Sequence, residues 1–297
     1  MTKIVYDQAA GLRSLVSFQT SDSVRVITIA GGKKGIGKTC VAINLATTLA
    51  KNGKRVLLID ENQCQKSISA TLGLKARFDL LHVIKKDKTL EQVLVQGPED
   101  ISILPAIRGI HALTKLDVHE QAWLIKCFAE LTETVDVVLV DTAMGGTTHV
   151  LPLSLASEQV LIVLSGSANS LTGAYALMKI MSQEYAKQHF LILVNRVDSR
   201  PEAMAIFDGL SKVVNQYLSV SLDYVGYVPN EEKLRYATQL YKPVVDVYPA
   251  SHAAICFRQL AENIIHLSCS DDFGGGIEDF MQRLIHTSHL SMANFTA

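Results

Sequence analysis

The feature that most constrains this chain is a glycine-rich loop placed between an apolar run and a helical pattern. Residues 32–39 fit the pattern G-x-x-x-x-G-K-[ST]. The loop follows the apolar run Val24–Ile29 and opens the amphipathic stretch Lys38–Lys51. In such a loop, backbone N–H groups surround phosphates, the lysine reaches the terminal phosphates and the hydroxyl binds Mg²⁺. The positive end of the helix adds to this anion site. The sequence therefore predicts a nucleotide site, and the residues assigned to it are Gly32, Lys33, Lys34, Gly35, Ile36, Gly37, Lys38, Thr39 and Cys40.

The rest of the chain predicts an α/β fold around that unit. Apolar runs alternate with amphipathic stretches, which is typical of βαβ units and of a doubly wound, mostly parallel sheet. Apolar residues make up 48% of the chain, enough for a sizeable core. The expected strands are Val24–Ile29, Arg55–Ile59, Ile101–Leu104, Val135–Val140, Gln159–Leu164, Phe190–Val194 and Leu222–Gly226. The expected helices are Lys38–Lys51, His119–Glu133, Ser170–Lys187, Pro201–Tyr217 and Ser251–Leu267.

Two segments stand outside the predicted nucleotide-binding domain of residues 24–267. Residues 1–23 precede the first strand and contain a short amphipathic stretch. Residues 268–276 (SCSDDFGGG) have the composition of a flexible linker, and residues 277–297 form a tail. We expect residues 277–290 of this tail to form a detached helix.

Charge and cysteine content exclude several classes of protein. Lys and Arg number 28 and Asp and Glu 29, so a surface devoted to DNA is disfavoured. The five cysteines are scattered and lack metal-ligand spacing, which favours a reducing compartment over a disulfide framework. The N-terminus lacks the pattern of a signal peptide, and no apolar stretch is long enough to span a bilayer. We therefore expect a cytosolic protein.

Two carboxylates follow apolar runs at positions suited to a metal ion. Asp60 ends the run RVLLID and Asp141 ends VDVVLVD. A carboxylate at the end of a strand can hold the water shell of Mg²⁺, although alone it is usually a cap or turn residue. Beside the phosphate loop, the metal role is favoured. The predicted magnesium residues are Thr39, Asp60 and Asp141.

Lys33, just inside the phosphate loop, is where the chain resembles the MinD/ParA family, whose members carry a deviant Walker A loop. The resemblance covers about residues 24–267. The matching segments are Asp60, Asp141-Thr142, Ala174-Tyr175-Ala176-Leu177-Met178-Lys179, Asn195-Arg196, Gly226-Tyr227-Val228-Pro229 and Pro243-Val244. The resemblance implies ATP or ADP with Mg²⁺, and a homodimer in which Lys33 reaches the partner's phosphates. It also implies that Asn195 and Pro229 lie near the adenine and that Arg196 belongs to the same nucleotide-binding set.

The segment before the first strand indicates one group of proteins within this family. Residues 7–13 (DQAAGLR) resemble the activator motif of flagellar-number regulators of the FlhG (FleN) type within this family. This implies contact with a GTPase of the signal-recognition-particle type, FlhF, through Asp7, Gln8, Leu12 and Arg13. Basal-body proteins and flagellar transcription regulators are further expected partners. The alternative is an ordinary amphipathic helix packed on its own domain.

The chain departs from the family pattern at residues that take part in ATP hydrolysis. The family reads Asp-x-Asp after its second strand (switch I), whereas this chain reads Asp60-Glu61-Asn62. An amide cannot accept a proton from water as a carboxylate does. Lys34 replaces a glycine, and residues 141–145 (switch II) lack the usual proline. With Lys33, Asn62 and Asp141 as the catalytic candidates, we expect slow or absent ATP hydrolysis. The competing view is that Glu61, or water held by Asn62, restores turnover.

The tail has one apolar helical face, formed by Ile277, Phe280, Met281, Leu284 and Ile285. In the family this position often carries a helix that binds the membrane when ATP releases it. Only Arg283 offers a full positive charge here, and Glu278 and Asp279 oppose anionic lipid. Peripheral attachment to the inner face of the cytoplasmic membrane or cell pole, and docking on the chain's own domain, both stay open.

The sequence thus favours an ATP-binding regulator of flagellar number or placement. Two other functions stay open: an active MinD/ParA-type ATPase that positions a division site or cargo, and a scaffold that binds no nucleotide.

Overall fold

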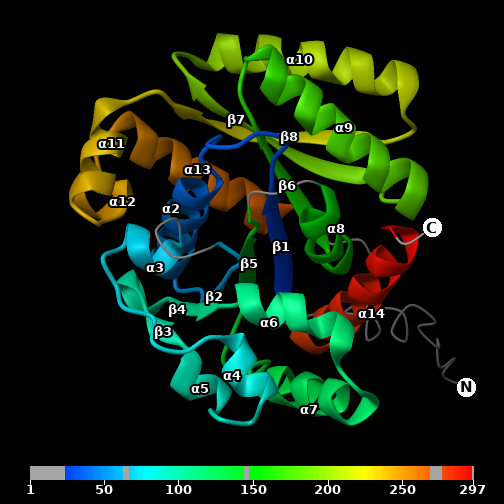
Figure 1. The fold of residues 1–297 in the computed structure, drawn as a ribbon. Coiled ribbons are helices and arrows are strands. Elements are labelled where there is room, and N and C mark those ends of the chain that lie inside the picture. The colour runs from blue at the N-terminus through cyan, green and yellow to red at the C-terminus, as the bar shows by residue number, and fades with distance from the viewer. Residues whose placement is uncertain (1–23, 63–66, 144–146, 268–275, 296–297) are drawn as a thin grey trace, which may run out of the picture.

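The computed structural model describes residues 24–62, 67–143, 147–267 and 276–295. They form a sheet in the order β3-β4-β2-β5-β1-β6-β7-β8, in which only the β3–β4 pair at one edge is antiparallel (Figure 1). The strands are β1 (Arg25–Ala30), β2 (Val56–Asp60), β3 (Val95–Gln96), β4 (Ser102–Pro105), β5 (Val137–Asp141), β6 (Gln159–Leu164), β7 (His189–Val197) and β8 (Ser221–Pro229). The doubly wound, mostly parallel sheet predicted from the sequence is confirmed.

Helices cover both faces of this sheet (Figure 1). They are α2 (Lys38–Lys51), α3 (Ile68–Thr71), α4 (Leu80–Ile84), α5 (Leu90–Val93), α6 (Ile107–Ala112), α7 (Val118–Ala129), α8 (Thr147–Ala156), α9 (Ala168–Tyr185), α10 (Arg200–Tyr217), α11 (Glu232–Gln239), α12 (Val244–Val247), α13 (His252–His266) and α14 (Ile277–Phe295), with 3₁₀ turns at Pro98–Asp100 and Leu113–Lys115. The long helices lie where the sequence predicts them, except that α7 ends at Ala129 rather than at Glu133. The short elements α3 to α6, α11, α12 and β3 were not predicted, because two to eight residues show little periodicity.

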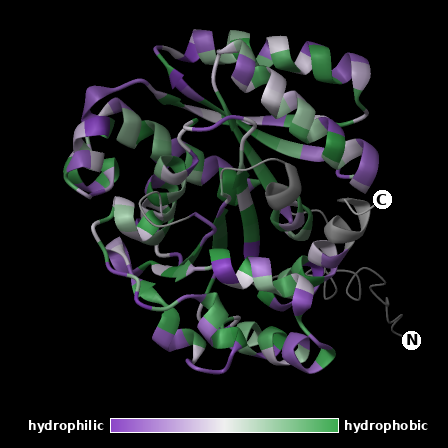
Figure 2. Ribbon diagram, viewed as in Figure 1, coloured by the Kyte–Doolittle hydropathy of each residue, from purple (hydrophilic) through white to green (hydrophobic). Residues whose placement is uncertain are grey.

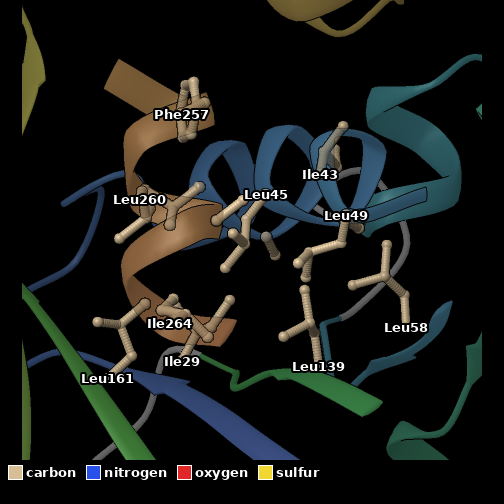
Figure 3. Close-up of a cluster of buried hydrophobic side chains, with 14 of the residues drawn as sticks. Ile29, Ile43, Leu45, Leu49, Leu58, Leu139, Leu161, Phe257, Leu260 and Ile264 are labelled. Carbon is tan, nitrogen blue, oxygen red and sulfur yellow. The ribbon is translucent and has the colours of Figure 1, made fainter. Parts of the chain in front are cut away.

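Alternate residues of each strand point to opposite faces and build separate cores. In β5, Val137 and Leu139 join one cluster, whereas Val138 and Val140 join another. Colouring by hydropathy shows the strands as mainly hydrophobic and the outer helix surfaces as more polar (Figure 2). Figure 3 shows the first cluster, in which side chains of α2 and α13 meet those of the strands. Burial on both faces explains why the strands lack alternation in sequence.

Helix α14 is part of the second core rather than a detached element. All five residues of its apolar face are buried there, with exposures between 0% for Phe280 and 4% for Ile285. Arg283 Nε donates to the carbonyl of Ala156 at 3.0 Å, and Thr287 Oγ1 donates to that of Pro152 at 3.2 Å. The expectation of a detached helix is therefore wrong, because the apolar face that suggested an external partner is satisfied by α7 and α8. No helix in the described ranges is both long and apolar enough to cross a membrane.

Candidate functional site

The phosphate loop joins β1 to α2 at the carboxyl edge of the sheet, where parallel α/β folds place ligands. Two of its glycines are required by the geometry. Gly37 has φ 102°, and a Cβ there would lie 2.4 Å from the side-chain nitrogen of Asn195. A Cβ on Gly32 would lie 1.9 Å from the carbonyl carbon of Gly173 in α9. The loop thus passes between β7 and α9 with no room for larger residues at these points.

Two residues of β7 hold the loop from the side. Asn195 Nδ2 donates to the Ile36 carbonyl at 2.6 Å, and Arg196 Nη2 donates to the Gly35 carbonyl at 2.6 Å. Asn195 is buried, and Arg196 adopts φ 64°, an unusual backbone conformation for a large side chain. Pro229, at the end of β8, pairs with Val197 beside them. These contacts order the loop, while contact of Asn195 and Pro229 with a base, and of Arg196 with the nucleotide, stays a prediction.

Lys38 and Thr39 of the loop face the acidic end of β5. Thr39 Oγ1 donates to Asp141 Oδ2 at 2.6 Å. Lys38 is only 6% exposed, and burial lowers the pKa of its ammonium while Asp141 and Glu61 oppose that shift. Asp141 is fully buried, and burial raises the pKa of its carboxyl to about 7. The structure therefore brings Lys38, Thr39 and Asp141 together as the sequence predicts.

Asp60 and Asn62 complete this cluster from the end of β2. The Asn62 amide nitrogen donates to Asp60 Oδ1 at 3.1 Å and to Asp141 Oδ2 at 2.8 Å, so it bridges the two carboxylates. Asp60 Oδ2 accepts the backbone N–H of Ile68 at 2.6 Å. Burial raises the pKa of Asp60 to about 6. Asn62 acts here as a donor, which a second aspartate in its place could not do while ionised.

Glu61, which the sequence offers only as an alternative to Asn62, belongs to the same cluster in the structure. Its side chain is fully buried, and Oε2 accepts the backbone N–H of Ala143 at 2.7 Å, which links the segment after β2 to the segment after β5. Its own N–H donates to the Asp141 carbonyl at 3.1 Å. Burial raises the pKa of the carboxyl to about 8. The sequence signal was the position itself, since Glu61 directly follows an aspartate at the end of an apolar strand.

The residues fit the phosphates and Mg²⁺ that the loop pattern implies. Asp141 Oδ1 is buried and has no hydrogen-bond partner among the described residues, so it is available as an oxygen ligand. Lys38 offers a buried positive charge beside it. Lys33 and Lys34 are exposed on the outer side of the loop. Cys40 is half-buried, and burial raises the pKa of its thiol to about 11, while Asn44 donates to its sulfur.

The remaining predicted residues lie away from this cluster. Asp7, Gln8, Leu12 and Arg13 fall outside the described residues. The apolar face of α14 lies in the second core, under α7 and α8.

Comparison with known proteins agrees with this geometry. The family model described as an AAA domain matches residues 24–192. The antiactivator FleN of Pseudomonas aeruginosa is 35% identical over 262 residues, which cover 88% of this chain and 94% of FleN. The flagellum site-determining protein YlxH of Helicobacter pylori is 25% identical over 276 residues, which cover 90% of this chain and 92% of YlxH.

Among solved structures, the MinC:MinD cell division protein complex of Aquifex aeolicus has a chain that superposes with a TM-score of 0.63. It is 25% identical, and the match covers 85% of this chain and 100% of that one. The chain therefore belongs to the MinD/ParA family of P-loop proteins with a deviant Walker A loop, in the branch that contains the FleN antiactivators.

Proposed function

We propose that this protein is an ATP-binding regulator of flagellar number or placement. The observation that carries the proposal is the similarity to FleN, which extends over nearly the whole of both chains. YlxH, whose name also refers to the flagellum, is similar over a comparable span. The phosphate loop and the buried acidic cluster behind it supply the means by which such a regulator would bind nucleotide.

Each residue of the cluster has a proposed part in nucleotide binding. Lys38 neutralises the terminal phosphates, and the helix that it begins directs its free N–H groups at them. Thr39 and Asp141, already hydrogen-bonded to each other, hold Mg²⁺, with Asp60 behind them. The metal would spread the phosphate charge when bound. Arg196 and Asn195 fix the loop in the shape that this binding needs.

Weak ATP hydrolysis is the second part of the proposal. Catalysis would require a group that positions water and accepts its proton. Asn62 has its amide nitrogen committed to Asp60 and Asp141, and an amide is not a base. Glu61 is turned toward the Ala143 backbone, so it also does not point to an open position. The protein would therefore hold ATP for long periods and act through contacts rather than through turnover.

Exposure of Lys33 supports a nucleotide-dependent dimer. A lysine that reached its own phosphates would be held within the loop, whereas this side chain lies on the outer surface. Lys34 beside it adds a second positive charge to the same surface. We propose that Lys33 contacts the phosphates of a second copy, and that the neighbouring charge makes this association sensitive to salt.

The proposed partner is a GTPase of the FlhF type, contacted through Gln8 and Arg13. The test is GTP hydrolysis by the cognate GTPase with the full-length protein added. Stimulation that is lost in Gln8→Ala and kept in Gln19→Ala, a matched glutamine in the same segment, supports this proposal. If the intact protein gives no stimulation, a MinD/ParA-type positioning ATPase becomes the better account, and steady ATP turnover would support it.

A fluorescent-nucleotide titration tests the binding step separately. Saturable binding that requires Mg²⁺ supports the proposal. No binding would instead identify the chain as a scaffold that uses the α/β shell for protein contacts alone.

Membrane attachment would require α14 to leave its place in the core, because its apolar face is buried. We propose that this helix is docked in one nucleotide state and released in another. Flotation with liposomes, with and without ATP, tests the idea. Binding only with ATP supports release, whereas no binding in either condition removes membrane targeting.

A further inference from the structure

A large cavity lies beside the phosphate loop but on the other side of β2. Its volume is about 900 Å³, within the range of about 300–1,000 Å³ that is usual for sites of small molecules. It is lined by α3, by the segment 74–79 and by the start of α6, with Asp60 and Asn62 at its inner end. The nucleotide role proposed above does not use α3, α6 or the segment 74–79.

The walls of this cavity are largely apolar. Leu74, Phe78, Pro105 and Ile107 line it, each of them only partly buried. Ala70 and Ala76 add small side chains that keep the space open. A ligand body would therefore need apolar surface to displace the water that covers these walls.

The acidic side chains at the cavity have partners within the protein, whereas two of the basic ones have none in the described ranges. Both of its acids are satisfied within the protein: Asp79 accepts from Arg108 and pairs with His82, and Asp60 accepts from Asn62 and Ile68. In contrast, the exposed Lys75 and Arg77 have no hydrogen bond or ion pair to any described residue. Asp60 is buried and bonded to neutral donors, so the exposed charges at the cavity that have no partner among the described residues are positive.

A buried hydroxyl provides an independent sign of a missing partner. Ser69 lines the cavity and is 3% exposed, yet its Oγ has no hydrogen-bond partner among the described residues. Buried polar groups are nearly always paired, because leaving one unpaired costs about 1–3 kcal/mol. A polar atom of a ligand in the cavity would satisfy it.

We propose that this cavity binds an amphipathic organic anion: a carboxylate, sulfonate or phosphate group on a compact apolar body. Arg77 and Lys75 bind the anionic group, and Leu74, Phe78 and Ile107 pack against the body. Ser69 supplies a hydrogen bond deeper in the cavity. Asp60 and Asn62 border both this cavity and the acidic cluster, but the binding groups proposed here lie away from the residues expected near the base, because β5, β1 and β6 lie between the cavity at β2–β4 and Asn195 on β7.

The test uses 1-anilinonaphthalene-8-sulfonate as the probe, because it joins an apolar aromatic body to one anionic group. The probe is titrated into the full-length protein without nucleotide, and fluorescence gives affinity and stoichiometry. We expect one site per chain. Arg77→Glu should weaken binding at least tenfold, whereas Lys212→Glu, an exposed residue of α10, should leave it unchanged. Ala76→Trp, which fills the cavity from an exposed position, should also weaken it.

Two results would overturn the proposal. One is equal probe affinity in Arg77→Glu, Ala76→Trp and the parent protein, all with unchanged thermal midpoints. The other is full displacement of the probe by excess Mg-ADP, which would place it in the nucleotide site. Because the titration needs no nucleotide, its result is independent of whether the protein binds ATP.

Discussion

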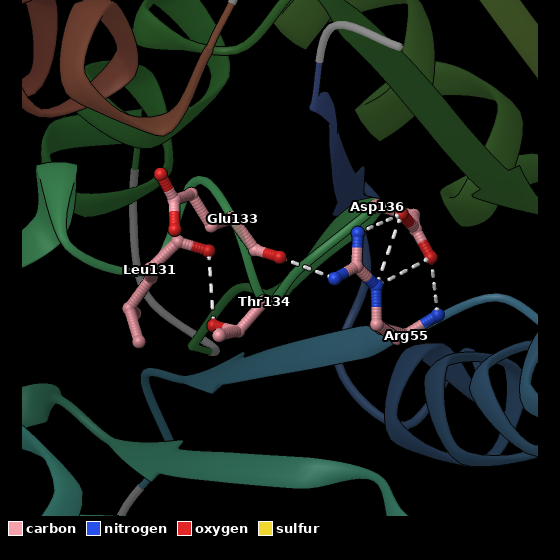
Figure 4. A network of polar contacts seen from close by, with 5 residues as sticks. All are labelled: Arg55, Leu131, Glu133, Thr134 and Asp136. Atoms are coloured by element: carbon pink, nitrogen blue, oxygen red, sulfur yellow. Dashed lines mark hydrogen bonds and ion pairs between the residues drawn. The ribbon is translucent and has the colours of Figure 1, made fainter.

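The two ends of strands β2 and β5 carry acidic residues in opposite electrostatic settings. At the amino end, Arg55 binds Asp136 through its guanidinium at 2.6 Å and its backbone N–H at 2.7 Å (Figure 4). The Arg55 side chain also donates to the Glu133 carbonyl. This hydrogen bonding lowers the pKa of Asp136. At the carboxyl end, burial raises the pKa of Asp141 to about 7 and that of Glu61 to about 8.

The difference favours the carboxyl end of these strands as the place for a ligand. Asp136 has its charge matched within the chain and lies near solvent, so that end stabilises the fold at little cost. The other end holds acids in a buried place where donors reach only some of their oxygens, and it leaves one oxygen each of Asp141 and Glu61 unpaired among the described residues. Such an arrangement costs stability, which a function that needs the acids would explain.

The largest effect that separates the two ends is expected at Lys38. Lys38→Ala removes the buried positive charge opposite Asp141, and nucleotide affinity should fall at least a hundredfold, about 3 kcal/mol. Isothermal titration with Mg-ATP measures it. The Arg55→Ala variant, which is changed at the amino end of the same strands, should bind Mg-ATP with the affinity of the parent protein. Equal loss in both variants would contradict the assignment of the carboxyl end.

The second largest effect is the contribution of Glu61 to the pH dependence of stability. In the folded protein this carboxyl keeps its proton to about pH 8, whereas an unfolded glutamate loses it near pH 4.5. The native state therefore binds more protons between these values, and stability falls as pH rises through the window. Glu61→Gln removes the contribution of Glu61, while the raised pKa values of Asp60 and Asp141 still contribute, so the fall should become shallower and the variant should gain about 2 kcal/mol relative to the parent at pH 8.5.

Chemical denaturation of the nucleotide-free protein at pH 5 and pH 8.5 checks this prediction. The exposed Glu130→Gln is the control, and it should leave the pH dependence unchanged. An equally steep fall in Glu61→Gln would show that Glu61 is already ionised in the folded protein.

A smaller effect is expected from restoring the acid of the family pattern. Asn62→Asp should raise steady-state ATP hydrolysis about tenfold, since the aspartate can accept a proton from water. Phosphate release measures the rate, with Asn52→Asp at the exposed end of α2 as a matched control. No increase over the parent would count against Asn62 as the cause of slow turnover.

The smallest effect is the loss of stability expected when the ion pair at the amino end of β2 and β5 is broken. Arg55→Ala should lower the free energy of unfolding by about 1 kcal/mol or less, because the pair is half exposed. High salt should shrink that difference further. A loss of several kcal/mol in urea denaturation would show that the pair contributes more than its exposure suggests.

Whether the sequence predicted a helix depended on how regularly its apolar residues are spaced. Long helices such as α2 and α10 were found because their apolar faces repeat every turn. Helix α8 was missed because it is apolar nearly all round and contains Pro152. Its surroundings explain the pattern, since α14 packs along it. The loop residues Lys38 and Thr39 and the acid Asp141 were found from local spacing alone.

The sequence by itself determined the phosphate loop, the parallel sheet and the family, because these depend on spacing and on runs of apolar residues within one segment. Tertiary structure alone decided where the tail lies, that Glu61 holds the backbone at Ala143, and that Asn62 bridges Asp60 and Asp141. The reason is physical. Apart from the Asn62–Asp60 hydrogen bond, these contacts join residues 79 or more positions apart. Burial, which sets the pKa of each acid, exists only once the strands and helices have packed.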